Sequence, residues 1–164
     1  SFERAMSLNP RDPDAMHNRA WFKCQRGQYD DADRLFEQAI ATPQYRDLAR
    51  SLMAQGICYA RAGRMVPAEQ KLLRAYEVDP TNPTTAYNLA DVLYRRSELE
   101  RARFYIRRVN DNEELSNAQT LWLAARSEDK AGSRNAVEVF GRQLRARFPQ
   151  SPQAQAYDSG RFND

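Results

Sequence analysis

The sequence predicts an all-α fold built as a stack of antiparallel helix pairs, and two observations support this prediction. A short motif recurs at 27–32, 63–68 and 97–102, each time between two segments whose apolar residues follow the period of a helix. Six prolines fall between the predicted pairs, where proline can start a helix but cannot continue one. One pair cannot bury its apolar stripe alone, so we expect the pairs to stack around a continuous core.

The recurring motif reads GQYDDA, then GRMVPA, then SELERA. Each copy is followed by a large apolar residue and then a small one, and these pairs are Phe36 and Ala39, Leu72 and Ala75, and Ile106 and Val109. The chain therefore resembles the tetratricopeptide repeat (TPR) family, which has this period. The expected fold is all-α, a TPR right-handed superhelical solenoid of antiparallel helix pairs with a concave inner surface.

The turns inside the pairs carry glycine where the chain reverses. Gly27 and Gly63 stand where a left-handed residue is favourable. Ser97 replaces glycine in the third turn, so we expect that turn to be closed differently.

The elements follow from this frame in chain order, as a single domain over 1–164. The first segment is expected to be the second helix of a repeat whose first helix is missing from the chain. Three complete repeats, a degenerate repeat with Gly132 near its turn and a C-terminal tail follow. The expected ranges are 1–10, 13–44, 48–80, 83–112, 115–149 and 150–164.

Composition and charge exclude several classes of protein. The mean hydropathy is −0.84, and no apolar run approaches the roughly 18 residues that a membrane span needs. The 25 basic and 22 acidic residues are interspersed, and Glu98 and Glu100 lie at ion-pairing spacings within the densest basic stretch, 95–108. We therefore expect a mixed, solvated surface and no nucleic-acid binding.

The sequence offers little for catalysis, and no cofactor is expected. His17 is the only histidine, which excludes a histidine-based acid/base pair or a two-histidine metal site within this chain. Cys24, Cys58 and His17 have suitable types for zinc ligands but lack compact ligand spacing. No phosphate-binding glycine loop or nucleophile elbow is present. We expect a binding protein and not an enzyme.

The TPR frame places particular first-helix residues on the concave side, which is the usual peptide-binding surface of that family. Aromatic, methionine and arginine side chains among them are typical of interface cores. The expected groove residues are His17, Trp21, Gln25, Met53, Ile57, Arg61, Tyr87, Asp91, Tyr94 and Arg95. Trp21 and Ile57 fit equally well as packing residues between neighbouring helices. A lysine and asparagine clamp for a terminal carboxylate, as in some co-chaperones, is not completed here.

Cys24 and Cys58 lie near the ends of first helices in consecutive repeats. Adjacent helix axes are about 8–10 Å apart, and a disulfide forms when the Cα atoms come within roughly 7 Å. The positions favour a bridge, and two buried free thiols in a reducing compartment are the alternative.

Several segments resemble the type IV pilus biogenesis TPR lipoproteins of the PilF and PilW type, and PilW most. The segments are NRAWFKC at 18–24, FEQA at 36–39, TPQY at 42–45, QGIC at 55–58 and FPQS at 148–151. Arg19-Ala20 departs from the Tyr-Gly pair usual in that family. The resemblance implies a disulfide between Cys24 and Cys58 and a soluble portion of a protein whose acylated N-terminus is absent from this chain.

The same resemblance implies a scaffold anchored by lipid at the periplasmic face of the outer membrane. Its implied partners are the outer-membrane secretin of the type IV pilus machinery and other pilus assembly proteins. Its implied role is to help the secretin assemble or localise and to support functional pili. The alternatives are a cytosolic TPR adaptor or co-chaperone-like module that binds peptide segments of another complex and, more distantly, an accessory domain of an enzyme.

Overall fold

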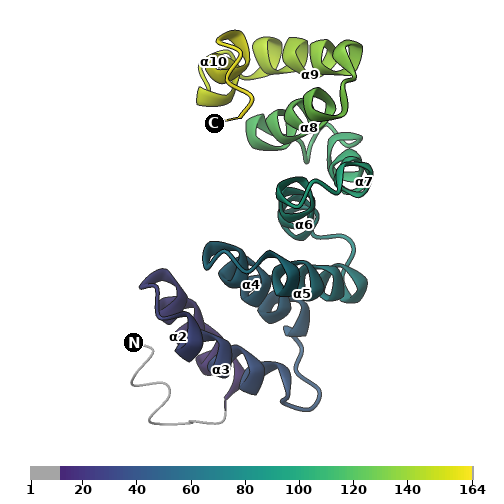
Figure 1. Ribbon diagram of the computed structural model, residues 1–164. Helices are drawn as coiled ribbons and strands as arrows, with labels where there is room; N and C mark the ends of the chain where they lie inside the picture. Colours follow the sequence, from purple (N-terminus) through teal and green to yellow (C-terminus); the bar gives the residue numbers. More distant parts are fainter. Residues whose placement is uncertain (1–11, 164) are drawn as a thin grey trace. The chain divides into compact units, whose positions relative to one another are not determined.

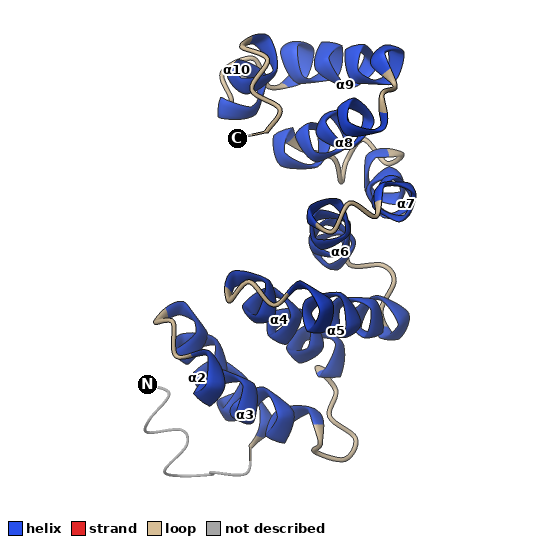
Figure 2. Ribbon diagram, viewed as in Figure 1, coloured by secondary structure: helices blue, strands red, loops and turns tan. Residues whose placement is uncertain are grey.

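The computed structural model describes residues 12–163, and every regular element in that range is a helix (Figures 1 and 2). The helices are α2 (Pro13–Gln25), α3 (Tyr29–Ile40), α4 (Leu48–Arg61), α5 (Met65–Val78), α6 (Pro83–Arg95), α7 (Leu99–Asn110), α8 (Ala118–Ala131), α9 (Arg134–Arg147) and α10 (Pro152–Asp158). The all-α prediction is confirmed for this range. The helix expected over 1–10 lies outside the described residues. None of the described helices combines the length and the apolar character that crossing a membrane requires.

The chain divides into two compact units, Ser1–Thr85 and Ala86–Asp164. In the first unit α2 packs on α3, α3 on α4, and α4 on α5. In the second unit α8 packs on both α7 and α9, and α10 packs on α8 and α9. Each unit therefore has its own helix packing, and the expectation of a single domain over 1–164 stays a prediction.

Small residues set the close packing in the first unit. Ala20 and Ala32 are fully buried beside Phe36 in the core formed by α2, α3 and α4. A Cβ atom added to Gly56 would lie 2.6 Å from Cγ of Leu72, so α4 and α5 approach closely only because position 56 has no side chain.

The segment expected to be a C-terminal tail contains a helix, α10. Ser151 caps it, because its Oγ accepts a hydrogen bond from the backbone N–H of Ala154 at 3.0 Å, and Pro152 follows at the first turn. Ala154 is buried against α8 and α9, and the Phe162 ring lies 5.1 Å from the Trp122 ring. The C-terminal segment thus includes a helix that covers the apolar end of the last helix pair.

The turn at Ser97 is closed in the same way as the glycine turns, contrary to expectation. Gly27, Gly63 and Gly132 have φ between 77° and 81°, and Ser97 adopts φ 61°. The backbone N–H of Ser97 donates to the carbonyl of Tyr94 at 3.0 Å, as the N–H of Gly27 donates to that of Cys24 at 2.9 Å. Serine thus occupies a left-handed position that glycine adopts at lower cost.

Candidate protein-binding face

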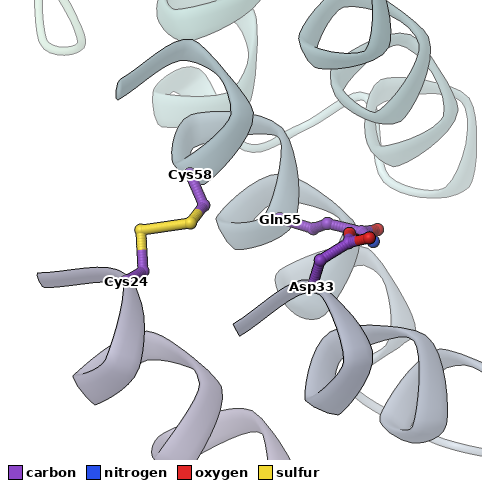
Figure 3. Close-up of a disulfide and its surroundings, with 4 residues drawn as sticks. All are labelled: Cys24, Asp33, Gln55 and Cys58. Atoms are coloured by element: carbon purple, nitrogen blue, oxygen red, sulfur yellow. A yellow bond between two sulfur atoms is a disulfide. The ribbon is translucent and has the colours of Figure 1, made fainter. Parts of the chain in front are cut away.

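A disulfide joins α2 to α4 through Cys24 and Cys58 (Figure 3). The two Cα atoms are 5.9 Å apart, within the range that a disulfide requires. Both residues are buried in the core cluster that includes Phe36. The bridge therefore ties two first helices of consecutive pairs within the first unit.

His17, expected in the groove, is instead buried between α2 and α4 with 4% of its surface exposed. Its Nδ1 forms a hydrogen bond with Ser51 Oγ at 2.8 Å, and its ring meets that of Phe36 edge to face at 5.7 Å. Burial, aided by the nearby charge of Arg50, lowers the pKa of His17 from 6.5 to about 4. The side chain is neutral at pH 7 and belongs to the core.

Among the other expected groove residues of the first unit, Gln25 and Arg61 are exposed, and the remaining three are partly buried. The Trp21 ring packs against the core cluster on one side, and the Arg61 guanidinium carbon lies 5.1 Å from its centroid. Met53 accepts a hydrogen bond from Thr85 Oγ1 through its sulfur at 3.1 Å, and Ile57 is half-buried. Trp21 and Met53 therefore contact neighbouring helices in this unit.

In the second unit, α6 brings its four expected residues to one side. Three of them, Tyr87, Asp91 and Tyr94, follow one another at spacings of four and three residues, which places them on one helical face. Arg95 lies four residues after Asp91 and borders the same face. An Oδ2 atom of Asp91 lies 3.2 Å from an Nη2 atom of Arg95, and Arg95 is exposed. Tyr94 is largely buried, so it supports the face from beneath.

Two cations from α8 cover Tyr94. The guanidinium carbon of Arg126 lies 5.2 Å from the Tyr94 ring centroid and 5.7 Å from that of Trp122. Lys130 Nζ lies 4.7 Å from the same Tyr94 centroid and 3.4 Å from Ser97 Oγ. These contacts unite α6 and α8 in one surface, here termed the aromatic-cationic face. Its members are Tyr87, Asp91, Tyr94, Arg95, Trp122, Arg126 and Lys130.

The electrostatics of this face reflect partial burial among mixed charges. Burial raises the pKa of Asp91, and the positive charges of Arg95 and Arg126 oppose this change. Burial also raises the pKa of Tyr87, helped by the negative charge of Asp91. Nε of Arg126 is buried and has no hydrogen-bond partner among the described residues. The face thus presents the partly exposed Tyr87 ring beside the charged groups of Arg95, Arg126 and Lys130.

Sequence reasoning missed three members of this face, Trp122, Arg126 and Lys130. They occupy the positions of Met53, Ile57 and Arg61 in the earlier pair, at a constant offset of 69 residues. The signal that could have found them is Gly132, which lies 69 residues after the equivalent turn glycine Gly63 and so aligns the degenerate pair with the earlier one. Within 12–163, no group of three histidine, cysteine, aspartate or glutamate residues is arranged to hold a metal ion.

Comparison with known proteins finds similarity to TPR proteins of the type IV pilus. A tetratricopeptide repeat model matches residues 1–34. The crystal structure of PilW, described as a widely conserved type IV pilus biogenesis factor, matches with a TM-score of 0.87 and 28% identity, over 94% of this chain and 71% of that one. A structure of PilF from Pseudomonas aeruginosa matches with a TM-score of 0.79 and 21% identity, over 97% of this chain and 71% of that one.

The type IV pilus assembly protein PilF of Pseudomonas aeruginosa is 21% identical over 158 residues, which is 96% of this chain. The chain spans 62% of the length of this curated relative. These findings confirm the TPR fold and the resemblance to type IV pilus TPR proteins that the sequence indicated.

Proposed function

We propose that this chain is a non-enzymatic protein-interaction scaffold of type IV pilus biogenesis. The observation that carries the proposal is the similarity to PilW, at 28% identity over 94% of this chain. Repeat proteins of this kind bind partners through surfaces built across neighbouring helices. The aromatic-cationic face supplies such a surface, with the residue types that dominate interface energetics.

The finer role that we propose is to help the outer-membrane secretin assemble or localise and to support functional pili. The scaffold would act at the periplasmic face of the outer membrane, held there by a lipid anchor outside this chain. The Cys24–Cys58 disulfide supports this compartment, since such bonds persist in the periplasm and are rare in the cytosol. A cytosolic TPR adaptor is the alternative, and the disulfide argues against it.

Binding on the aromatic-cationic face would use its exposed and partly exposed groups. A partner segment that lies along α6 and α8 can contact the charged groups of Arg126 and Lys130, which lie over the Tyr94 ring. The segment can also pair with the exposed guanidinium of Arg95 and cover the Tyr87 ring. The contacts with the partner are then aromatic contacts and charge-assisted hydrogen bonds, and all of them are non-covalent.

Affinity measurement against the purified secretin of the same machinery tests this proposal. Arg126→Ala removes the central cation of the face, and we expect binding to weaken about tenfold or more, as truncation at interface hot spots does. Arg108→Ala is the matched control, because Arg108 lies on α7 over the Phe104 ring, outside the face. Equal secretin affinity for Arg126→Ala and the native chain, at unchanged helical circular dichroism, would refute this use of the face.

A further inference from the structure

The second unit has a cavity between α7 and α9, and two residues of α8 also line it. Its volume is about 620 Å³, and its apolar lining includes Ile106, Ala124, Val139 and Phe140. Val139 is 42% exposed although it is a large apolar residue. None of the residues that line this α7–α9 cleft is a member of the aromatic-cationic face. The cleft is therefore a separate surface.

The cleft lies where the last helix pair has the small residue Ala124 at the position of a larger polar residue in the first unit. Ala124 and Gln55 occupy the same repeat position, each eight residues before the left-handed glycine that follows. In the first unit, Gln55 Nε2 donates to Asp33 Oδ1 at 2.8 Å and to Glu37 Oε1 at 2.7 Å (Figure 3 shows Gln55 and Asp33). The cavity left beside Gln55 is only about 10 Å³. The methyl group of Ala124 cannot fill the equivalent space between α7 and α9.

One of the residues that line the cleft, Glu128, has a buried acceptor without a partner among the described residues. Glu128 lines the cleft and is only 5% exposed. Its Oε1 accepts from Arg103 Nε at 2.8 Å, whereas Oε2 is buried and has no hydrogen-bond partner among the described residues. A buried carboxylate oxygen without a hydrogen-bond partner destabilises the folded chain. A ligand that donates an N–H to this oxygen would remove that cost, which favours binding.

The rim of the cleft is positively charged. Arg107 is exposed and forms no ion pair within the part of the chain that the structure describes. Arg134, on the opposite rim, reaches Asp129 only at 3.7 Å and is also exposed. Arginine at such a rim favours carboxylates, because the guanidinium presents several donors in one plane. The surroundings thus combine an apolar floor, one buried acceptor and two available cations.

We propose that the α7–α9 cleft is a second docking site, for a peptide segment of a partner protein in which an apolar side chain is flanked by acidic residues. The apolar side chain covers Ile106, Val139 and Phe140 on the cleft floor. A backbone N–H of the segment donates to Glu128 Oε2, and its carboxylates pair with Arg107 and Arg134. This site goes beyond the proposed function, since it uses other side chains than the aromatic-cationic face and stands whether or not that face binds the secretin.

Titration of the full isotope-labelled chain by nuclear magnetic resonance tests this site with two blocked peptides. The acidic peptide is GDFDG, and its neutral counterpart is GNFNG. We expect saturable shift changes at the amides of α7 and α9 around Arg107 and Val139, with the acidic peptide binding about two- to fivefold more tightly, as expected for exposed ion pairs. Absence of saturable shifts there, or equal binding of the two peptides, overturns the proposal.

Two variants and one control variant identify the binding surface. Ala124→Gln should fill the cleft as Gln55 fills its counterpart and abolish the shift changes. Arg107→Gln should weaken binding of the acidic peptide about two- to fivefold, whereas Arg108→Gln, on the same helix but over the Phe104 ring, should leave it unchanged. Both arginines are exposed, so these two variants remain informative even if Ala124→Gln fails to fold. Equal effects of the two arginine variants would overturn the assignment.

Discussion

Removing the Cys24–Cys58 disulfide should destabilise the first unit by an amount that its loop length sets. The bridged residues are separated by 34 positions, for which the chain-entropy model gives about 3.8 kcal/mol at 25 °C. We therefore expect Cys24→Ala/Cys58→Ala to lower the free energy of unfolding of this unit by about that much. Alanine keeps both positions apolar within the cluster that contains Phe36.

The assay is chemical denaturation followed by tryptophan fluorescence in a Trp122→Phe background. Trp21 is then the only tryptophan, and it packs against the cluster that contains Cys24 and Cys58. Addition of a reductant should destabilise the chain with both cysteines to the same extent and should not affect the double alanine variant. A loss below about 1 kcal/mol, well under the model value, would refute the loop-entropy reasoning.

Three further predictions concern local features. As the pH falls from 6.5 towards about 4, His17 takes up a proton in the unfolded chain but not in the folded one. The free energy of unfolding should therefore fall by up to about 3 kcal/mol over this pH range. An equally steep dependence of the free energy of unfolding on pH in His17→Gln, measured by chemical denaturation, would contradict this. Ser97→Gly should stabilise the chain by about 0.5 kcal/mol and so raise its melting temperature, because glycine adopts the left-handed conformation at lower cost than serine. A lower melting temperature would show that the contact of the Ser97 hydroxyl with Lys130 outweighs this strain. Gly56→Ala should cost about 1–3 kcal/mol in denaturant titration, since the added methyl group overlaps Leu72; a stabilised variant would mean that helix propensity prevails.

The repeat pattern predicted the all-α fold because the deciding interactions are local. Left-handed glycines, prolines between pairs and a regular apolar stripe are each visible within one repeat. Even the error at Ser97 is local, since the chain accepts strain there and keeps the hydrogen bonds of the glycine turns. The cap formed by Ser151 and Pro152 was equally visible, although the segment was expected to be a tail.

The site was less predictable because burial depends on neighbours that are remote in sequence. His17 is buried by Ser51 and Phe36, whose approach follows only from the packing of α2, α3 and α4. The α7–α9 cleft lies beside Ala124, and a small residue at this position gives no signal in the sequence. Its effect is seen only when the space around it is compared with the space around Gln55. Periodicity gives the face of a helix, but it does not give the depth to which neighbouring side chains cover that face.

Photo-cross-linking in the native cell envelope is the most direct test of the scaffold role. A photoreactive side chain is placed at Arg95 or Lys130 on the aromatic-cationic face, and at Arg108 as the control, in the full-length protein. We expect a covalent adduct with the outer-membrane secretin from the first two positions and not from Arg108. No secretin adduct from either face position, or an equal yield from Arg108, would contradict the proposed binding of the secretin by this face.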